Sequence, residues 1–102
     1  MVDTNVVEDV DTKTKVIMRP PSMYNVILYN DNVTTMQFVT LILMNVFHKS
    51  INDAQLITID IHNNGKGIAG TYNYEIAYQK ANETLTLARA ATFPLRCEID
   101  KV

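Results

Sequence analysis

The segment from Tyr74 to Ala91 constrains the fold most, because it carries the clearest helix pattern in the chain. Good helix formers occupy most of the positions between its apolar residues. Phe93-Pro94 then ends the helix, since proline cannot continue it. The apolar residues lie on one stripe, which needs other elements to cover it: Tyr74, Ala77, Tyr78, Ala81, Leu85 and Ala88.

Shorter patterns predict the elements around this helix. Met23 to Leu28 is apolar, β-branched and aromatic, which indicates a strand. Thr34 to His48 is predicted as a helix, because a hydroxyl residue followed three positions later by Gln37 has the form of a capping box. Gly67 to Asn73 suits a short strand whose glycines allow close backbone approach, and Leu95 to Ile99 suits a last strand.

The segment from Ala54 to Asn63 is ambiguous. Three isoleucines alternate there with polar residues, which is strand periodicity, and Asn64-Gly65 would then be a hairpin turn. Ser50 with Asp53 offers the opposite interpretation, a helix N-cap, and Gly65 would end that helix. The local pattern alone slightly favours the strand.

Length, charge and cysteine content exclude several classes of protein. A chain of 102 residues can bury one modest core, which rules out a multidomain enzyme. Its net charge of −2 is not the basic footprint of a nucleic-acid-binding protein. Neither a signal peptide nor a membrane-spanning run is found, so we expect a cytoplasmic protein. A monomer is the default expectation. The single cysteine, Cys97, is expected to be a buried structural residue.

Residues 1–21 are expected to form a flexible N-terminal arm. They mix acidic and basic side chains and contain almost no large apolar residues, so little burial would offset the entropy lost on ordering. Pro20-Pro21 marks the boundary, and residues 22–102 are expected to form one domain.

The tripeptide Asn30-Asp31-Asn32 lies between the first strand and the helix that follows it. One interpretation is a simple turn. The other is a cluster of carboxylate and amide oxygens that could accept the three N–H bonds of an ammonium group. A metal site that combines His62 with Asp31 or Asp60 is a third possibility, although no recognised ligand spacing supports it.

Several separated motifs, taken together, resemble the ClpS adaptor family, which recognises N-degrons for Clp proteases. They run in the family's order from about Pro20 to Asp100: PPSMY, VILYND, TTMQFV, VFHKS, IHNNGKGIAG, YEIA and FPLRCEID. The resemblance implies an α+β fold, a small α/β sandwich. In it a three-stranded antiparallel sheet packs against three helices in the order β-α-α-β-α-β. It replaces the strand over Ala54 to Asn63 by a helix with His62 in its last turn.

The resemblance also implies a function: binding without catalysis and without a cofactor. Such an adaptor captures a protein by its free α-amine and a bulky hydrophobic first residue (Leu, Phe, Tyr or Trp). It then delivers that protein to the N-domain of a ClpA- or ClpC-like ATPase, and neither nucleic acid nor membrane takes part. The α-amine would be bound by Asn30, Asp31 and His62. A hydrophobic pocket would be formed by Thr34, Met36, Val39, Thr58, Ile61 and Leu95, with Met36 at its rim. ATPase docking would use Glu75 and Lys80.

Two residues depart from the family pattern. Asn32 stands where the family usually has a second aspartate, which should weaken electrostatic steering of the amine. Thr58 stands where many members have methionine, so the pocket should be wider and should tolerate Ile and Val. The alternative is an interaction domain of similar fold, like the C-terminal domain of the ribosomal stalk, without such a pocket.

Overall fold

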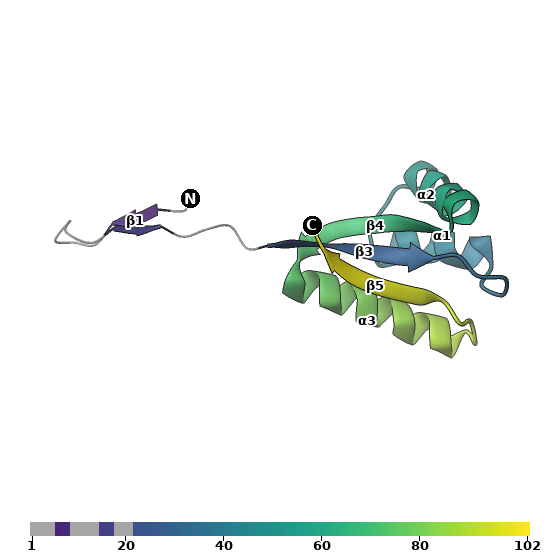
Figure 1. Ribbon diagram of the computed structural model, residues 1–102. Coiled ribbons are helices and arrows are strands. Elements are labelled where there is room, and N and C mark those ends of the chain that lie inside the picture. Colours follow the sequence, from purple (N-terminus) through teal and green to yellow (C-terminus); the bar gives the residue numbers. More distant parts are fainter. Residues whose placement is uncertain (1–5, 9–14, 18–21) are drawn as a thin grey trace.

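The computed structural model describes residues 6–8, 15–17 and 22–102. Residues 22–102 form three antiparallel strands and three helices in the expected order β-α-α-β-α-β (Figure 1). These elements are β3 (Met23–Tyr29), α1 (Met36–Asn45), α2 (Ile51–Asn64), β4 (Lys66–Asn73), α3 (Tyr74–Ala90) and β5 (Arg96–Lys101). None of the helices within the described ranges has the length and apolar character of a membrane span.

Two further strands lie within the segment that was predicted to be an arm. These strands, β1 (Val6–Glu8) and β2 (Lys15–Ile17), pair with each other in an antiparallel sheet of their own. The rest of the predicted arm lies outside the described residues, so its flexibility stays a prediction.

The main sheet has β3 in its centre, between β4 and β5. Tyr29, at the end of β3, stands opposite Lys66 of β4 and Arg96 of β5. All three strands therefore meet at the point where the chain leaves β3 for the loop that contains Asn30. A register shift between Val26 and Ile27 interrupts the β3–β4 pairing.

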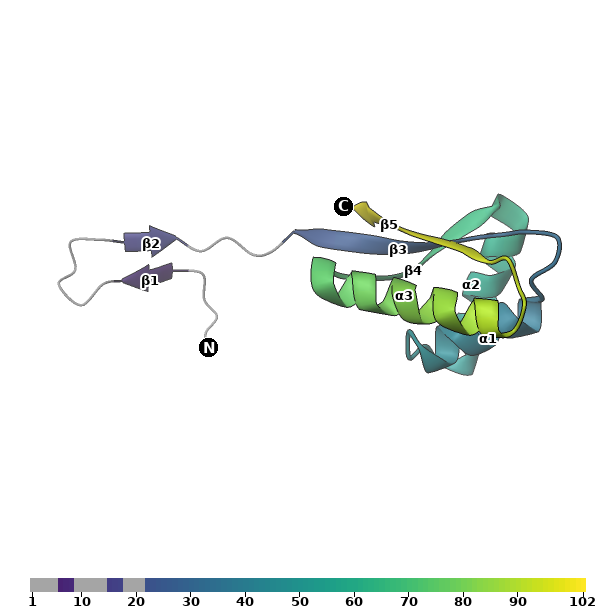
Figure 2. The ribbon, with the colours of Figure 1, turned by 90° about the horizontal axis from the view of Figure 1, so that it is seen from below.

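Helix α3 runs along one face of this sheet, while α1 and α2 lie together near the end of β3 (Figures 1 and 2). The buried positions of α3 are the small residues Ala77, Ala81, Thr84 and Ala88, which allow the helix to approach the strands closely. The core combines Val26 and Leu28 of β3 with residues of α1, among them Ile42 and Leu43, and with Leu95 before β5.

The strand that the isoleucine alternation favoured over Ala54 to Asn63 is wrong, because this segment is helical. Its buried residues are Ala54, Thr58 and Ile61, whose spacing is that of a helix face. The Ser50 hydroxyl accepts a hydrogen bond from the Asp53 amide at 3.1 Å and caps the helix. The helix implied by the family resemblance is thus confirmed.

Gly65 ends α2 and does not form a hairpin turn. It has a φ of 89°, a left-handed conformation that favours glycine, and its amide donates to the carbonyl of Ile61. Gly67 follows at the start of β4, where a Cβ would lie only 2.8 Å from Cγ1 of Ile61. The predicted close approach at this glycine is therefore confirmed, and it holds β4 tightly against α2.

Helix α1 is shorter than predicted at both ends. Its N-cap is Thr35, whose hydroxyl accepts from the Phe38 amide at 3.1 Å, and not Thr34. Thr34 is engaged by Asp31 instead, so it belongs to the preceding loop. At the other end, His48 lies beyond the last helical residue with a φ of 57°, which places it outside the helix that was expected to contain it.

Candidate functional site

The loop after β3 and the end of α2 are joined by a backbone hydrogen bond. The amide of Asn30 donates to the carbonyl of Gly65 at 2.9 Å. Gly65 caps α2 directly after the turn that carries His62. The structure therefore brings the segments of Asn30 and His62 to the same end of the domain. Both residues are exposed, and within residues 22–102 neither side chain has an internal hydrogen-bond partner.

Asp31 organises this loop. One carboxylate oxygen accepts from the amides of Val33 (2.8 Å) and Thr34 (2.6 Å), and the other accepts from the Thr34 hydroxyl (2.7 Å). Partial burial by itself would raise the pKa of Asp31, but these hydrogen bonds, with a smaller contribution from the charge of Arg89, hold it below its ordinary value. Asp31 is therefore ionised at neutral pH, and it places a negative charge beside Asn30.

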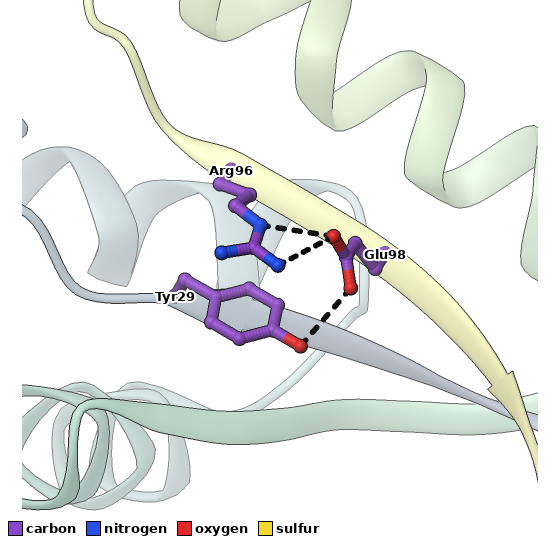
Figure 3. Close-up of polar contacts among 3 residues, drawn as sticks. All are labelled: Tyr29, Arg96 and Glu98. Carbon is purple, nitrogen blue, oxygen red and sulfur yellow. Dashed lines mark hydrogen bonds and ion pairs between the residues drawn. The ribbon is translucent and has the colours of Figure 1, made fainter.

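A polar cluster on the opposite face of the sheet from the core fixes the end of β3 (Figure 3). The hydroxyl of Tyr29 donates to Glu98 at 3.1 Å, and the guanidinium of Arg96 lies 2.7 Å from the same carboxylate and 4.1 Å from the centre of the Tyr29 ring. The hydrogen bonds from Arg96 and Tyr29 lower the pKa of Glu98. This cluster ties β3 to β5 immediately before Asn30, and the sequence did not predict it.

An apolar groove of about 800 Å³ runs between α1 and α2. Its α1 side is formed by Thr35, Met36, Gln37, Thr40, Leu41 and Met44. Its α2 side is formed by Ile51, Gln55, Thr58 and Ile59. The hydroxyl groups of Thr40 and Thr58 bond to each other at 2.9 Å across the groove, so neither presents an unpaired polar group to it. The Thr58 hydroxyl also lies 2.8 Å from the Ala54 carbonyl, to which it donates when Thr40 donates to Thr58.

The six residues predicted to form a hydrophobic pocket take three different positions. Met36 and Thr58 line the groove, and Met36 is 41% exposed at its edge. Thr34 is half-buried and bonded to Asp31. The other three, Val39, Ile61 and Leu95, are buried in the core. Their predicted role as pocket walls stays a prediction.

Sequence reasoning missed most of the groove. Leu41, Met44 and Ile51 are apolar residues that were given no role, and Ile59 was assigned to the alternation of an expected strand. Their number was the available signal, because a helix that is apolar on more than one stripe has a second face to cover.

The two residues predicted for ATPase docking lie five positions apart on α3. Glu75 is exposed in the first turn of the helix. Lys80 is half-buried, and its ammonium group donates to the carbonyl of Val46 at 2.7 Å, at the end of α1. It also lies 5.4 Å from the centre of the Tyr72 ring. The structure therefore gives Lys80 an internal contact that the sequence did not predict.

Two further candidate residues, Cys97 and Asp60, are accounted for by their positions in the fold. Cys97 is buried as expected, and burial raises the pKa of its thiol to about 12. The Asp60 carboxylate accepts a hydrogen bond from the side-chain amide of Asn64 at 2.7 Å. Among the residues described, no three His, Cys, Asp or Glu side chains are grouped closely enough to hold a metal ion.

The fold and the comparisons with known proteins define this chain as a protease adaptor. The sequence model of the family described as "ATP-dependent Clp protease adaptor protein ClpS" matches residues 19–98. The chain belongs to the ClpS family of ATP-dependent Clp protease adaptors. This membership decides against the stalk-like interaction domain.

Individual relatives agree with this assignment. The ClpS adapter protein of Lawsonia intracellularis is 49% identical over 85 residues, which cover 83% of this chain and 78% of the relative. That of Clostridium acetobutylicum is 48% identical over 94 residues, which cover 92% and 93%. Among solved structures, Agrobacterium tumefaciens ClpS2 bound to L-phenylalaninamide matches with a TM-score of 0.78 and 31% identity, covering 81% of this chain and all of that one.

Proposed function

We propose that this adaptor captures substrate proteins by their free N-terminal amine and first side chain, and delivers them to a Clp ATPase. The observation that carries the proposal is the hydrogen bond from the backbone amide of Asn30 to the backbone carbonyl of Gly65. It holds Asn30 beside the last turn of α2, so that Asn30 and His62 can bind one small cationic group from two elements.

The amine site would work through charge-assisted hydrogen bonds. The amide oxygen of Asn30 and one ring nitrogen of neutral His62 accept N–H bonds from the ammonium group. Each such bond to a charged donor contributes about 1.5–3 kcal/mol. Asp31 contributes chiefly by its negative charge and by ordering the loop, because both of its oxygens already accept bonds from Val33 and Thr34. Its remaining lone pairs can reach the amine or first peptide unit through water.

The first side chain would enter the groove at the end formed by Met36 and Thr58. Burial of a Leu or Phe side chain there contributes about 1.5–3 kcal/mol. Tyr and Trp suit the same apolar surface. Thr58 has a shorter side chain than methionine, and its hydroxyl is fully engaged, so β-branched Ile and Val should also bind.

Two features of related proteins support this proposal. ClpS2 of Agrobacterium tumefaciens is similar in fold and is bound to L-phenylalaninamide, a molecule with a free α-amine and an apolar side chain. The family is an adaptor of an ATP-dependent protease, which implies a second contact with the ATPase. We assign this contact to the face of α3 around Glu75 and Lys80, with the arm over residues 1–21 acting during delivery. The adaptor would act as a monomer and without catalysis.

The decisive experiment compares peptides that differ only at the amine. Fluorescence anisotropy would measure binding of a labelled peptide that begins with Phe, with and without acetylation of its N-terminus. Acetylation removes the cation and its donors, so affinity should fall by well over tenfold, which corresponds to more than about 1.4 kcal/mol. Equal binding of the two peptides would refute capture of the amine.

A further inference from the structure

We infer that the groove beyond Met36 and Thr58 binds the residues that follow the first one in the substrate, in extended form and by their apolar side chains. This inference rests on the proposed function, because it requires the substrate's amine to be held at the same end of α2. It adds a second determinant of substrate choice, the side chains at positions two to four of the captured protein.

The groove exposes apolar residues that the core leaves uncovered. Leu41 is 53% exposed, Ile51 is 50% exposed and Ile59 is 48% exposed, although all three are large hydrophobic residues. They lie together in one groove between two helices and are not scattered singly over the surface. A contiguous apolar patch of this kind marks a binding surface in a soluble protein.

One end of the groove lies next to the segments that carry the candidate amine site. Thr58 and Ile59 form its end on α2, and His62 follows one helical turn later on the same face. On α1, the groove begins at Thr35 and Met36, directly after the loop of Asn30 and its neighbours. A chain whose amine is held at His62 therefore reaches the groove within its first residue.

The length and volume of the groove exceed what one side chain needs. Met36 and Met44 are eight positions apart on α1, which is about 12 Å at 1.5 Å per helical residue. An extended chain advances about 3.3 Å per residue, so about three or four residues span that distance. The volume of about 800 Å³ also lies high in the range of pockets that hold whole drug-sized ligands, which is about 300–1,000 Å³.

The chemistry of the lining selects an apolar peptide. None of the ten residues that line the groove is charged, so a charged side chain placed there would lose water without gaining a partner. Gln37 and Gln55 supply amide groups that can bond to the backbone of an extended chain. Met36 and Met44 are unbranched and adapt to side chains of different shape. These features favour varied apolar sequences and disfavour acidic or basic ones.

The test uses labelled peptides that begin with Phe and share one tail but carry either Leu-Val-Leu or Ser-Gly-Ser at positions two to four. Anisotropy with the full chain should show about tenfold tighter binding of the apolar peptide. Leu41→Gln should remove most of this difference and leave the affinity for the Ser-Gly-Ser peptide unchanged. The matched control is Leu56→Gln, because Leu56 is 66% exposed on α2 and does not line the groove.

The outcomes separate this inference from the proposed function. Equal affinity for the two free peptides would overturn the groove inference while amine capture stands. Equal affinity for the free and the acetylated Ser-Gly-Ser peptide would overturn the proposed function. If sedimentation showed a wild-type dimer that Leu41→Gln dissociates, the groove would be an interface between copies of the chain, and the inference would be wrong.

Discussion

The hydroxyl groups of Thr40 and Thr58 form a hydrogen bond of 2.9 Å that connects α1 to α2 across the floor of the groove. Each hydroxyl has one proton, so one of them donates to the other, and the acceptor donates to a carbonyl of its own helix, Met36 for Thr40 (3.0 Å) or Ala54 for Thr58 (2.8 Å). Both hydroxyl groups are therefore satisfied in a largely apolar surface, which is the condition under which buried polar groups cost little. The bond also fixes the spacing of the two helices at the end of the groove that we assign to the first side chain.

Thr58→Met is expected to narrow the choice of first residue. The longer side chain fills space near Met36, so peptides that begin with Ile or Val should lose about tenfold in affinity relative to those that begin with Phe. A panel of peptides that differ only in residue one measures this by anisotropy. Thr58→Val is the matched control, because it keeps the branched shape and replaces the hydroxyl by a methyl group. Failure of the wild-type protein to bind the Ile and Val peptides would contradict the widened pocket.

Asn30→Ala should weaken binding of a Phe-led peptide by about tenfold or more, because one acceptor of the ammonium group is lost. The backbone bond to Gly65 uses the Asn30 amide and remains possible in the variant, so the loop should keep its place. His62→Ala should have a similar effect. Asn63→Ala, at an exposed position next to His62, serves as the control and should leave affinity unchanged. Full binding by Asn30→Ala would remove Asn30 from the amine site.

The fold could be predicted only in part from local pattern. The helical pattern of α3 and the Ser50 cap of α2 were readable, because both are properties of short stretches of sequence. The predicted stripe of α3 was correct only in part, because Tyr74 and Tyr78 are exposed and Thr84 is buried. The isoleucine alternation in α2 misled, because Ile59 belongs to the groove and not to the core. Of the three isoleucines, Ile57, Ile59 and Ile61, only Ile61 is fully buried. Family resemblance, which carries tertiary information, corrected this segment.

The candidate site was predictable to a different extent. Asn30, Asp31 and Asn32 were identifiable from their types and position after a strand. The engagement of Asp31 with the Thr34 hydroxyl was not, because it depends on the conformation of the loop. The depth of the groove depends on how α1 crosses α2, and no single segment of sequence contains that information.

The stability of the loop should depend on pH through Asp31. Its pKa is lower in the folded protein than in the unfolded chain, so its contribution is present above about pH 4 and is lost as pH falls through the folded pKa. Asp31→Asn should lower the free energy of unfolding by about 1 kcal/mol at pH 7, since solvent screens a partly exposed carboxylate. The difference between wild type and variant, measured by urea unfolding from pH 7 to pH 3, should shrink only below about pH 4. A difference that is constant over this range would contradict the assignment.

Lys80 tests whether one residue serves both stability and ATPase docking. Its ammonium group donates to the Val46 carbonyl at the end of α1, so Lys80→Met should lower the free energy of unfolding by about 1–3 kcal/mol while keeping the apolar stem. Lys101→Met, at an exposed position of β5, is the control and should change it by less than about 0.5 kcal/mol.

Docking can then be separated from stability with Glu75→Gln. Within residues 22–102 the Glu75 carboxylate makes no hydrogen bond or ion pair, and removal of its charge affects only a small interaction with the N-terminus of α3. This variant should therefore unfold within about 1 kcal/mol of wild type, yet bind the isolated N-domain of a Clp ATPase more weakly in calorimetry. If Lys80→Met weakens docking and Glu75→Gln does not, the effect of Lys80 comes from displacement of α1, and the face of α3 around Glu75 is not the docking surface.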